Sequence, residues 1–375
     1  MKKEYVFPEW MFPAEYEEFL NYVKKELNGN CTSMVFNMSR VKFFDIACIL
    51  QFICLLSELR QNGWEFVLKL PADADGKKTR DFLRRWRFFD ALEENVGDLK
   101  YLIPPEDQQY LQEEPSFYLR TTKYDERGII QQVLSKDIVE ITSFTKQEKN
   151  VQTVNEAMIE GQVSRFESDK SVGEIISKAL GLSFGKATSS NSARASYEVF
   201  YKTFVYESLI NTKHHPKATI SLMAVSVVPR RTHLVVAVAD NGECIPDTIS
   251  RAYRNHARHE SSQDYTLHLF PEPKRVKMEF AGKISESAKA DAKKIFFACL
   301  PWVTSRKPWE PNLGMGLTYL VRDTVRLGGE IRIRSGKATV SFVKKRGKTG
   351  CTASQATEWR GTLVRIQLPI VSKGE

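Results

Sequence analysis

Leu234-Val-Val-Ala-Val-Ala-Asp-Asn-Gly242 is the stretch that decides how the second half of this chain folds. Its first six residues form a short apolar run, which is typical of a strand buried on both faces. Asp240, Asn241 and Gly242 follow at once, and Asn-Gly is a strong turn signal. An ordinary hairpin turn would explain this pattern. A carboxylate at the end of a buried strand could also accept a hydrogen bond from the amino group of a bound adenine.

Upstream of this stretch, residues 195–215 are expected to form a helix because apolar side chains recur there at roughly helical spacing. Glu207, Asn211 and His215 lie four residues apart and so share one face, and Pro216 blocks further helix. A carboxylate and an amide oxygen on one face can orient a water molecule and bind Mg²⁺, which prefers oxygen ligands. Taken alone, this spacing is more often a solvated helix face.

Downstream, Leu313-Gly-Met-Gly-Leu317 precedes an expected helix over residues 317–327, which ends at a Gly-Gly pair before a strand over 330–334. Gly314 and Gly316, on either side of Met315, let the backbone approach an anion closely. A helix beginning at Leu317 would aim its free N–H groups at that anion. A lone G-x-G before a helix more often belongs to an ordinary loop that binds nothing.

A polar segment just before these glycines could serve the same anion. Thr304 and Ser305 offer hydroxyl groups, and Lys307 offers a cation for a terminal phosphate.

In this order, the segments resemble the motifs of the GHKL superfamily, the ATP-binding fold shared by gyrase, the Hsp90 chaperones, histidine kinases and the MutL repair proteins. Glu207 and Asn211 resemble its N-box, Asp240-Asn-Gly242 its G1 box and Gly314-Met-Gly316 its G2 box. Gly361-Thr362 resembles the late Gly-Thr that backs the adenine pocket. The resemblance covers roughly residue 171 to the C-terminus. It implies a two-layer α/β sandwich that holds ATP under a mobile lid.

The resemblance also implies roles for single residues. Asn211 would coordinate Mg²⁺, Asp240 would bind the adenine amino group, and Glu207 would act as general base toward the attacking water. Gly314 and Gly316 would hold the phosphates, and Lys307 would reach the terminal one. The other expected nucleotide-contacting residues belong to the same motifs: His215, Gly242, Thr304, Ser305, Met315, Leu317 and Thr362.

Two features depart from the family pattern. Cys244 stands where the G1 box usually has its second glycine, and residues 247–299 are long for a lid.

Glu207 also bears on the activity. Histidine kinases generally carry no carboxylate at this position, and the first histidine of this chain is His214, so a sensor histidine kinase is not expected. ATP hydrolysis fits better, with Glu207 placing water in line with the terminal phosphate. The spacing of glutamate, asparagine and histidine also resembles the anti-sigma serine kinases. Protein phosphorylation is therefore one alternative, and a non-catalytic ATP-gated binding module is another.

The first third of the chain alternates strands and helices, which predicts a small α/β layer domain. We expect strands over residues 33–37 and 64–70, and helices over 46–62 and 78–96. Residues 34–96 resemble a STAS domain, particularly Met38-Ser-Arg-Val-Lys-Phe-Phe-Asp45. Ile46, Ala47 and Cys48 follow Asp45 and offer no hydroxyl to phosphorylate, so this domain is expected to be a fixed surface for docking a protein partner or for dimerisation. A generic α/β domain is the alternative.

Length agrees with two domains, because 375 residues exceed the usual span of one hydrophobic core and 42% of them are hydrophobic. We expect a STAS-like domain over residues 1–103, a structured connector over 104–170 and a GHKL-type ATP-binding domain over 171–375. The connector should contain a strand over 138–144 and a polar helix near 154–163.

The charge is unevenly divided. The first 170 residues hold 23 Lys and Arg against 29 Asp and Glu, which leaves 32 against 17 for the rest of a chain whose net charge is +9. The basic half could contact a nucleic acid backbone or an acidic partner, including the first half itself. No helix-turn-helix, zinc-finger or RNA-binding signature accompanies the basic residues.

Other patterns exclude several classes. The six cysteines have no C-x-x-C spacing, which suits buried free thiols in a reducing compartment. His256, His259 and His268 have no completing ligands for a metal. The apolar stretch 47–56 is too short to span a bilayer, and the N-terminus lacks the apolar core of a signal peptide. We therefore expect a cytoplasmic protein. A homodimer is one possible state of its assembly.

Overall fold

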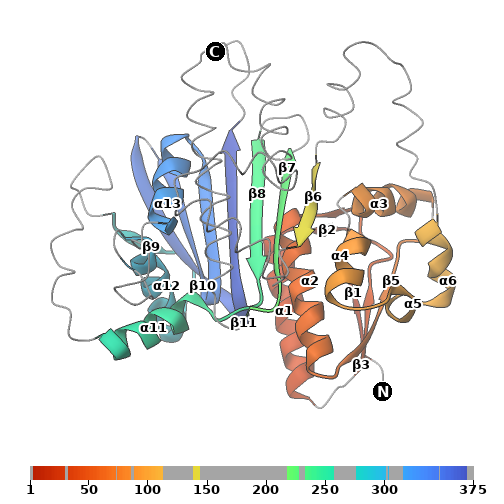
Figure 1. Ribbon diagram of the computed structural model, residues 1–375. Helices are drawn as coiled ribbons and strands as arrows, with labels where there is room; N and C mark the ends of the chain where they lie inside the picture. Colours follow the sequence, from red (N-terminus) through yellow and green to blue (C-terminus); the bar gives the residue numbers. More distant parts are fainter. Residues whose placement is uncertain are drawn as a thin grey trace, which may run out of the picture. The chain divides into compact units, whose positions relative to one another are not determined.

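The computed structural model describes residues 3–29, 33–72, 74–85, 88–112, 138–143, 218–227, 233–256, 276–300, 303, 316–345 and 347–369. The chain divides into two compact units, Met1–Ser143 with Leu222–Ser226, and Phe144–Ser221 with Val227–Glu375. Each unit contains helices and strands (Figure 1), which confirms the α/β class. The finer boundaries expected at residues 103 and 170 remain predictions.

The first unit contains a parallel sheet with the strand order β1-β3-β5, where β1 is Lys3–Val6, β3 is Ser33–Asn37 and β5 is Glu65–Lys69. Parallel neighbours need crossover connections, and two 16-residue helices supply them. These helices are α1 (Pro13–Asn28) and α2 (Ile46–Gln61). The strands predicted over 33–37 and 64–70 and the helix over 46–62 are confirmed, whereas β1 and α1 were not predicted.

Aromatic side chains fill the core of this unit. Phe7 is fully buried, and the ring centroids of Phe19, Phe36, Phe44 and Phe52 lie 4.8 to 6.4 Å from its own. Because strands and helices each contribute rings, this cluster joins the two layers of the unit.

Asp45 fixes the start of α2. Its side chain accepts a hydrogen bond from the backbone N–H of Ala47 at 2.9 Å, as an N-cap does. Ile46, Ala47 and Cys48 are all buried. The predicted absence of a phosphorylation switch here stays a prediction, and the burial of these three positions agrees with it.

The rest of the first unit is built from shorter elements. The single helix expected over 78–96 was wrong in part, because the structure has α3 (Ala74–Arg85) and α4 (Phe88–Asn95). The apolar pattern changes phase between them: Asp90 lies seven residues after buried Leu83 yet is exposed. The remaining elements are α5 (Leu99–Leu102), α6 (Pro105–Gln108), η1 (Gln109–Gln112), the parallel pair β2 (Trp10–Met11) and β4 (Phe43–Phe44), and the antiparallel pair β6 (Ile138–Ser143) and β7 (Ser221–Val227).

The second unit contains an antiparallel arrangement in which β11 (Lys348–Pro369) lies between β10 (Glu330–Lys345) and β8 (His233–Asp240). The short strand β9 (Met278–Phe280) pairs in parallel with residues 351–353 of β11. The strand expected over 330–334 is much longer than predicted. It continues past Ser335-Gly336 because the register shifts there as a bulge instead of ending the strand.

Helices α11 (Ile245–His256), α12 (Glu286–Ala298) and α13 (Gly316–Arg326) cover one face of this sheet (Figure 1). The helix predicted over 317–327 is thus confirmed to within one residue at each end. Gly329 follows α13 in close contact with β11, since a Cβ atom added to it would lie 2.5 Å from the backbone oxygen of Gln367.

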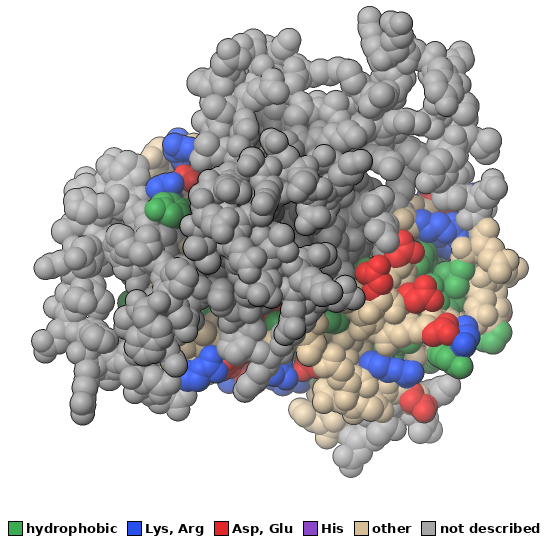
Figure 2. All heavy atoms as spheres, viewed as in Figure 1, with side chains coloured by type: hydrophobic (Ala, Val, Ile, Leu, Met, Phe, Trp, Pro, Cys, Tyr) green, Lys and Arg blue, Asp and Glu red, His purple; other side chains and the backbone are tan. Residues whose placement is uncertain are grey.

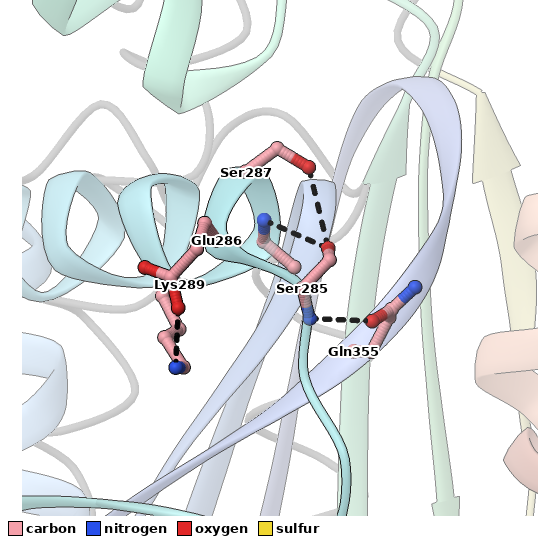
Figure 3. Close-up of polar contacts among 6 residues, drawn as sticks. Ser285, Glu286, Ser287, Lys289 and Gln355 are labelled. Carbon is pink, nitrogen blue, oxygen red and sulfur yellow. Dashed lines mark hydrogen bonds and ion pairs between the residues drawn. The ribbon is translucent and has the colours of Figure 1, made fainter.

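Three hydrogen bonds fix the two ends of α12. The N-cap Ser285 accepts a hydrogen bond from Ala288 N–H, and its own N–H donates to Gln355 Oε1 on β11 at 2.9 Å (Figure 3). At the other end of the helix, the Thr318 hydroxyl of α13 donates to the backbone oxygen of Cys299 at 2.9 Å. The region expected as a long lid therefore includes a helix anchored at both ends.

Charges of both signs are mixed on the described surface. Figure 2 shows Asp and Glu side chains on the first unit with Lys and Arg among them. Within residues 251–294, which hold much of the basic excess, Arg251 pairs with Glu243, and Lys289 pairs with Glu286 at 2.6 Å. Part of that excess is therefore neutralised locally. The use of the basic half as a nucleic-acid surface stays a prediction.

Candidate functional site

The end of β8 is the centre of the candidate site. Residues 235–239 are all buried, as predicted for a strand covered on both faces, and Asp240 is half-buried at its end. The chain then turns and enters α11 at Ile245. The alternative of an ordinary hairpin turn at Asn241-Gly242 is wrong, because a helix and not a strand follows.

Side-chain hydrogen bonds hold this turn in one shape. Asp240 Oδ1 accepts from Gly242 N–H at 2.8 Å, which is the pattern of an Asx turn. Asn241 is buried, and its Oδ1 accepts from the N–H groups of Thr219 and Ile220, both at 3.0 Å, while its Nδ2 donates to Thr219 Oγ1 at 2.8 Å. Asn241 thus clamps residues 219 and 220 to the turn, and the turn orients the Asp240 carboxylate.

Two glycines make close packing possible around Asp240. A Cβ atom added to Gly242 would lie 3.0 Å from both Ala218 Cβ and Asp240 Oδ1. A Cβ atom added to Gly361, whose φ is +92°, would lie 1.9 Å from the backbone oxygen of Asp240. No larger residue fits at position 361 without moving β8 or β11.

Oxygen-bearing side chains form a row across the three strands beside this turn. Thr362 on β11 is the register partner of Asp240 on β8 and also of Ser335 on β10. Directly opposite residues of antiparallel strands point to the same face. Ser335 Oγ accepts a hydrogen bond from Ile245 N–H at 2.9 Å, so this face is the one where α11 begins. We call Asp240, Thr362 and Ser335 the oxygen row.

Cys244 occupies the position at which the sequence departs from the GHKL motif that it resembles. Its thiol donates to the backbone oxygen of Trp359 on β11 at 3.3 Å, and burial raises its pKa above the usual value. The side chain is therefore a neutral thiol that links the turn to β11. In this way the turn accommodates a residue larger than glycine.

The start of α13 is the place where the sequence predicts that phosphates bind. This helix begins at Gly316, followed by Leu317. At its other end, a Cβ atom added to Gly328 would lie 3.8 Å from Pro369 Cγ, close to the end of β11. An 11-residue helix is about 16 Å long, which equals about five residues of strand. Because α13 packs on β10 and β11 and ends near Pro369, its first turn lies farther from that end of β11.

The structure thus brings together the predicted residues Asp240, Gly242 and Thr362, and places Gly316 and Leu317 at the start of α13. The other predicted site residues lie outside the described residues: Glu207, Asn211, His215, Thr304, Ser305, Lys307, Gly314 and Met315. The helices expected over 195–215 and 154–163 lie outside them too.

Sequence reasoning missed Ser335 and the clamping role of Asn241. Ser335 could have been noticed from the Ser-Gly pair that it forms inside an otherwise β-like run, because such pairs often mark bulges.

Three further predictions concern cysteines, metals and membranes. Cys48, Cys54, Cys244, Cys299 and Cys351 are buried thiols that form no disulfide among the described residues, as predicted. Among the described residues, no three His, Cys, Asp or Glu side chains gather as metal ligands. The searched part of the chain also contains no helix long and apolar enough to cross a membrane.

No known family model, curated protein or solved structure matches this chain.

Proposed function

We propose that the second unit binds ATP with Mg²⁺ in the manner of the GHKL superfamily and hydrolyses it, and that the bound nucleotide alters contacts with a partner. The observation that carries this proposal is the pairing of Asp240 with Thr362. These residues are far apart in the sequence and belong to two separate motifs. The family resemblance assigns both motifs to the adenine end of one pocket.

The shape of the unit supports the same proposal. Helices α11, α12 and α13 on one face of antiparallel β8, β11 and β10 have the layers that a two-layer α/β sandwich requires. The turn after β8 leaves the Asp240 carboxylate oriented by its own hydrogen bond to Gly242. A carboxylate fixed in this way loses little entropy when it accepts a hydrogen bond from an amino group.

The phosphate end has support from α13 and from covalent geometry. The first N–H groups of a helix have no partners within the helix and attract anions, and α13 starts within the G2-like motif. Asn211 precedes Ala218 by seven residues, which span at most about 25 Å. Ala218 lies against Gly242, so a Mg²⁺ ligand at Asn211 is within reach of a triphosphate whose base sits at Asp240.

Changing Glu207 to alanine tests the hydrolysis step. We expect Glu207→Ala to keep its ATP affinity within about twofold and to lose hydrolysis by about 100-fold or more, because no group then orients the attacking water. Turnover of labelled ATP is the measurement, made with and without DNA. Glu286→Ala is the matched control, since that glutamate is 88% exposed and pairs only with a neighbouring lysine of α12 among the contacts described.

Retained hydrolysis in Glu207→Ala would remove this residue from the mechanism. Labelled phosphate on a partner protein would instead assign the protein kinase alternative. ATP held without turnover under every condition would assign the non-catalytic binding module.

A further inference from the structure

Ser335 is the buried end of the oxygen row and the one member for which the family resemblance gives no role. Its side chain is fully buried, and its Oγ lies within hydrogen-bonding distance of three groups. It is 2.9 Å from Ile245 N, 3.3 Å from the backbone oxygen of Gly361 and 2.9 Å from Thr362 Oγ1.

Counting protons fixes the direction of these hydrogen bonds. A serine hydroxyl has one proton and two lone pairs. The N–H of Ile245 can only donate, so it takes one lone pair of Ser335. The carbonyl of Gly361 can only accept, so it takes the Ser335 proton. The neighbouring Cys244 sulfur can also interact with the Ser335 hydroxyl, but it is a weaker acceptor than that carbonyl.

All three contacts of Ser335 can be hydrogen bonds at once only if the remaining one runs from Thr362 to Ser335. In that arrangement Thr362 donates its only proton to the second lone pair of Ser335 across 2.9 Å. The Thr362 oxygen therefore presents lone pairs alone to its other neighbours. Its register partner Asp240 carries a carboxylate, which also only accepts when ionised.

We propose that Ser335 is a positioning residue that turns the Thr362 hydroxyl inward and so makes this end of the site accept hydrogen bonds without donating them. The inference rests on the proposed nucleotide site. Such a site favours a purine with an amino group at position 6 over one with a carbonyl there, because the carbonyl oxygen would face acceptors and make no hydrogen bond. Ser335 thereby contributes to the choice of adenine over hypoxanthine and guanine.

The test compares ATP with ITP, which differ at position 6 of the purine and, as a consequence, in the proton that ITP carries on N1. We expect the wild-type chain to bind ATP about 100-fold more tightly than ITP by titration calorimetry. In Ser335→Ala the Thr362 hydroxyl can rotate and donate, so the preference should fall about tenfold, mainly through tighter ITP binding. Thr362→Val removes the hydroxyl and keeps both other bonds of Ser335, so it should also lower the preference.

The double variant separates positioning from a general structural effect. If Ser335 acts through Thr362, then Ser335→Ala combined with Thr362→Val should match Thr362→Val alone. Ser341→Ala, a hydroxyl loss elsewhere on β10, should keep the wild-type preference.

The possible results are distinct. An unchanged ATP-to-ITP ratio in Thr362→Val, or in a folded Ser335→Ala, would overturn the inference while leaving the nucleotide site intact. A wild-type chain that binds neither nucleotide would overturn the proposed function and this inference with it.

Discussion

Gly361→Ala is expected to destabilise the second unit by more than about 3 kcal/mol, because among the described glycines its added Cβ atom would make the shortest contact. The backbone at Gly361 has a φ of +92°, where side chains are strained by about 1–3 kcal/mol. The added Cβ atom would also lie 1.9 Å from the backbone oxygen of Asp240, a contact that only movement of β8 or β11 can relieve. Urea unfolding and amide hydrogen exchange in β8 measure the loss.

Gly347→Ala is the matched control for this prediction. Gly347 also has a positive φ, +78°, but an added Cβ atom would meet nothing within 4 Å. Gly347→Ala should therefore lower the free energy of unfolding only through backbone strain, by about 1 kcal/mol. If both variants lost the same stability, β11 would not approach the turn after β8 as closely as described.

Asp240→Asn is expected to weaken ATP binding by about 100-fold with little change in stability. The amide keeps an oxygen that can accept the N–H of Gly242, so the turn is preserved. It replaces the other carboxylate oxygen by an NH₂ group, which is a donor facing the donor amino group of adenine, and such a buried mismatch costs about 1–3 kcal/mol or more. Titration of the variant with Mg-ATP gives the affinity.

Asp247→Asn controls for the loss of one negative charge in the same segment. Asp247 is exposed in the first turn of α11, so its variant should bind ATP as the wild type does. If Asp240→Asn also bound ATP with unchanged affinity, Asp240 would not form a hydrogen bond with the adenine amino group.

Elements with a strong local pattern were predictable from the sequence. The apolar run before Asp240 needed only its composition to be identified as a buried strand, and α13 is bounded by glycines at both ends. Helix α1 was missed although Tyr16, Phe19, Leu20 and Val23 are buried at helical spacing, because Pro13 and six acidic or basic residues obscure that pattern in the sequence.

The features that were not predictable depend on contacts between distant residues. Nothing local to Asn241 indicates that its side chain clamps residues 219 and 220. Nothing local to Ser335 indicates that it faces both the start of α11 and Thr362. Their roles arise only when β8, β10 and β11 come together, so a motif can indicate a site while the groups that orient its side chains stay hidden.

Titration of the intact chain with ATP in the presence of Mg²⁺ tests the central claim most directly. The account predicts saturable uptake of one ATP per chain, a requirement for Mg²⁺ for full affinity, and a melting temperature that rises with ATP concentration. It also predicts that ITP is taken up far more weakly. Absence of heat at millimolar ATP, together with an unchanged melting temperature, would contradict the account.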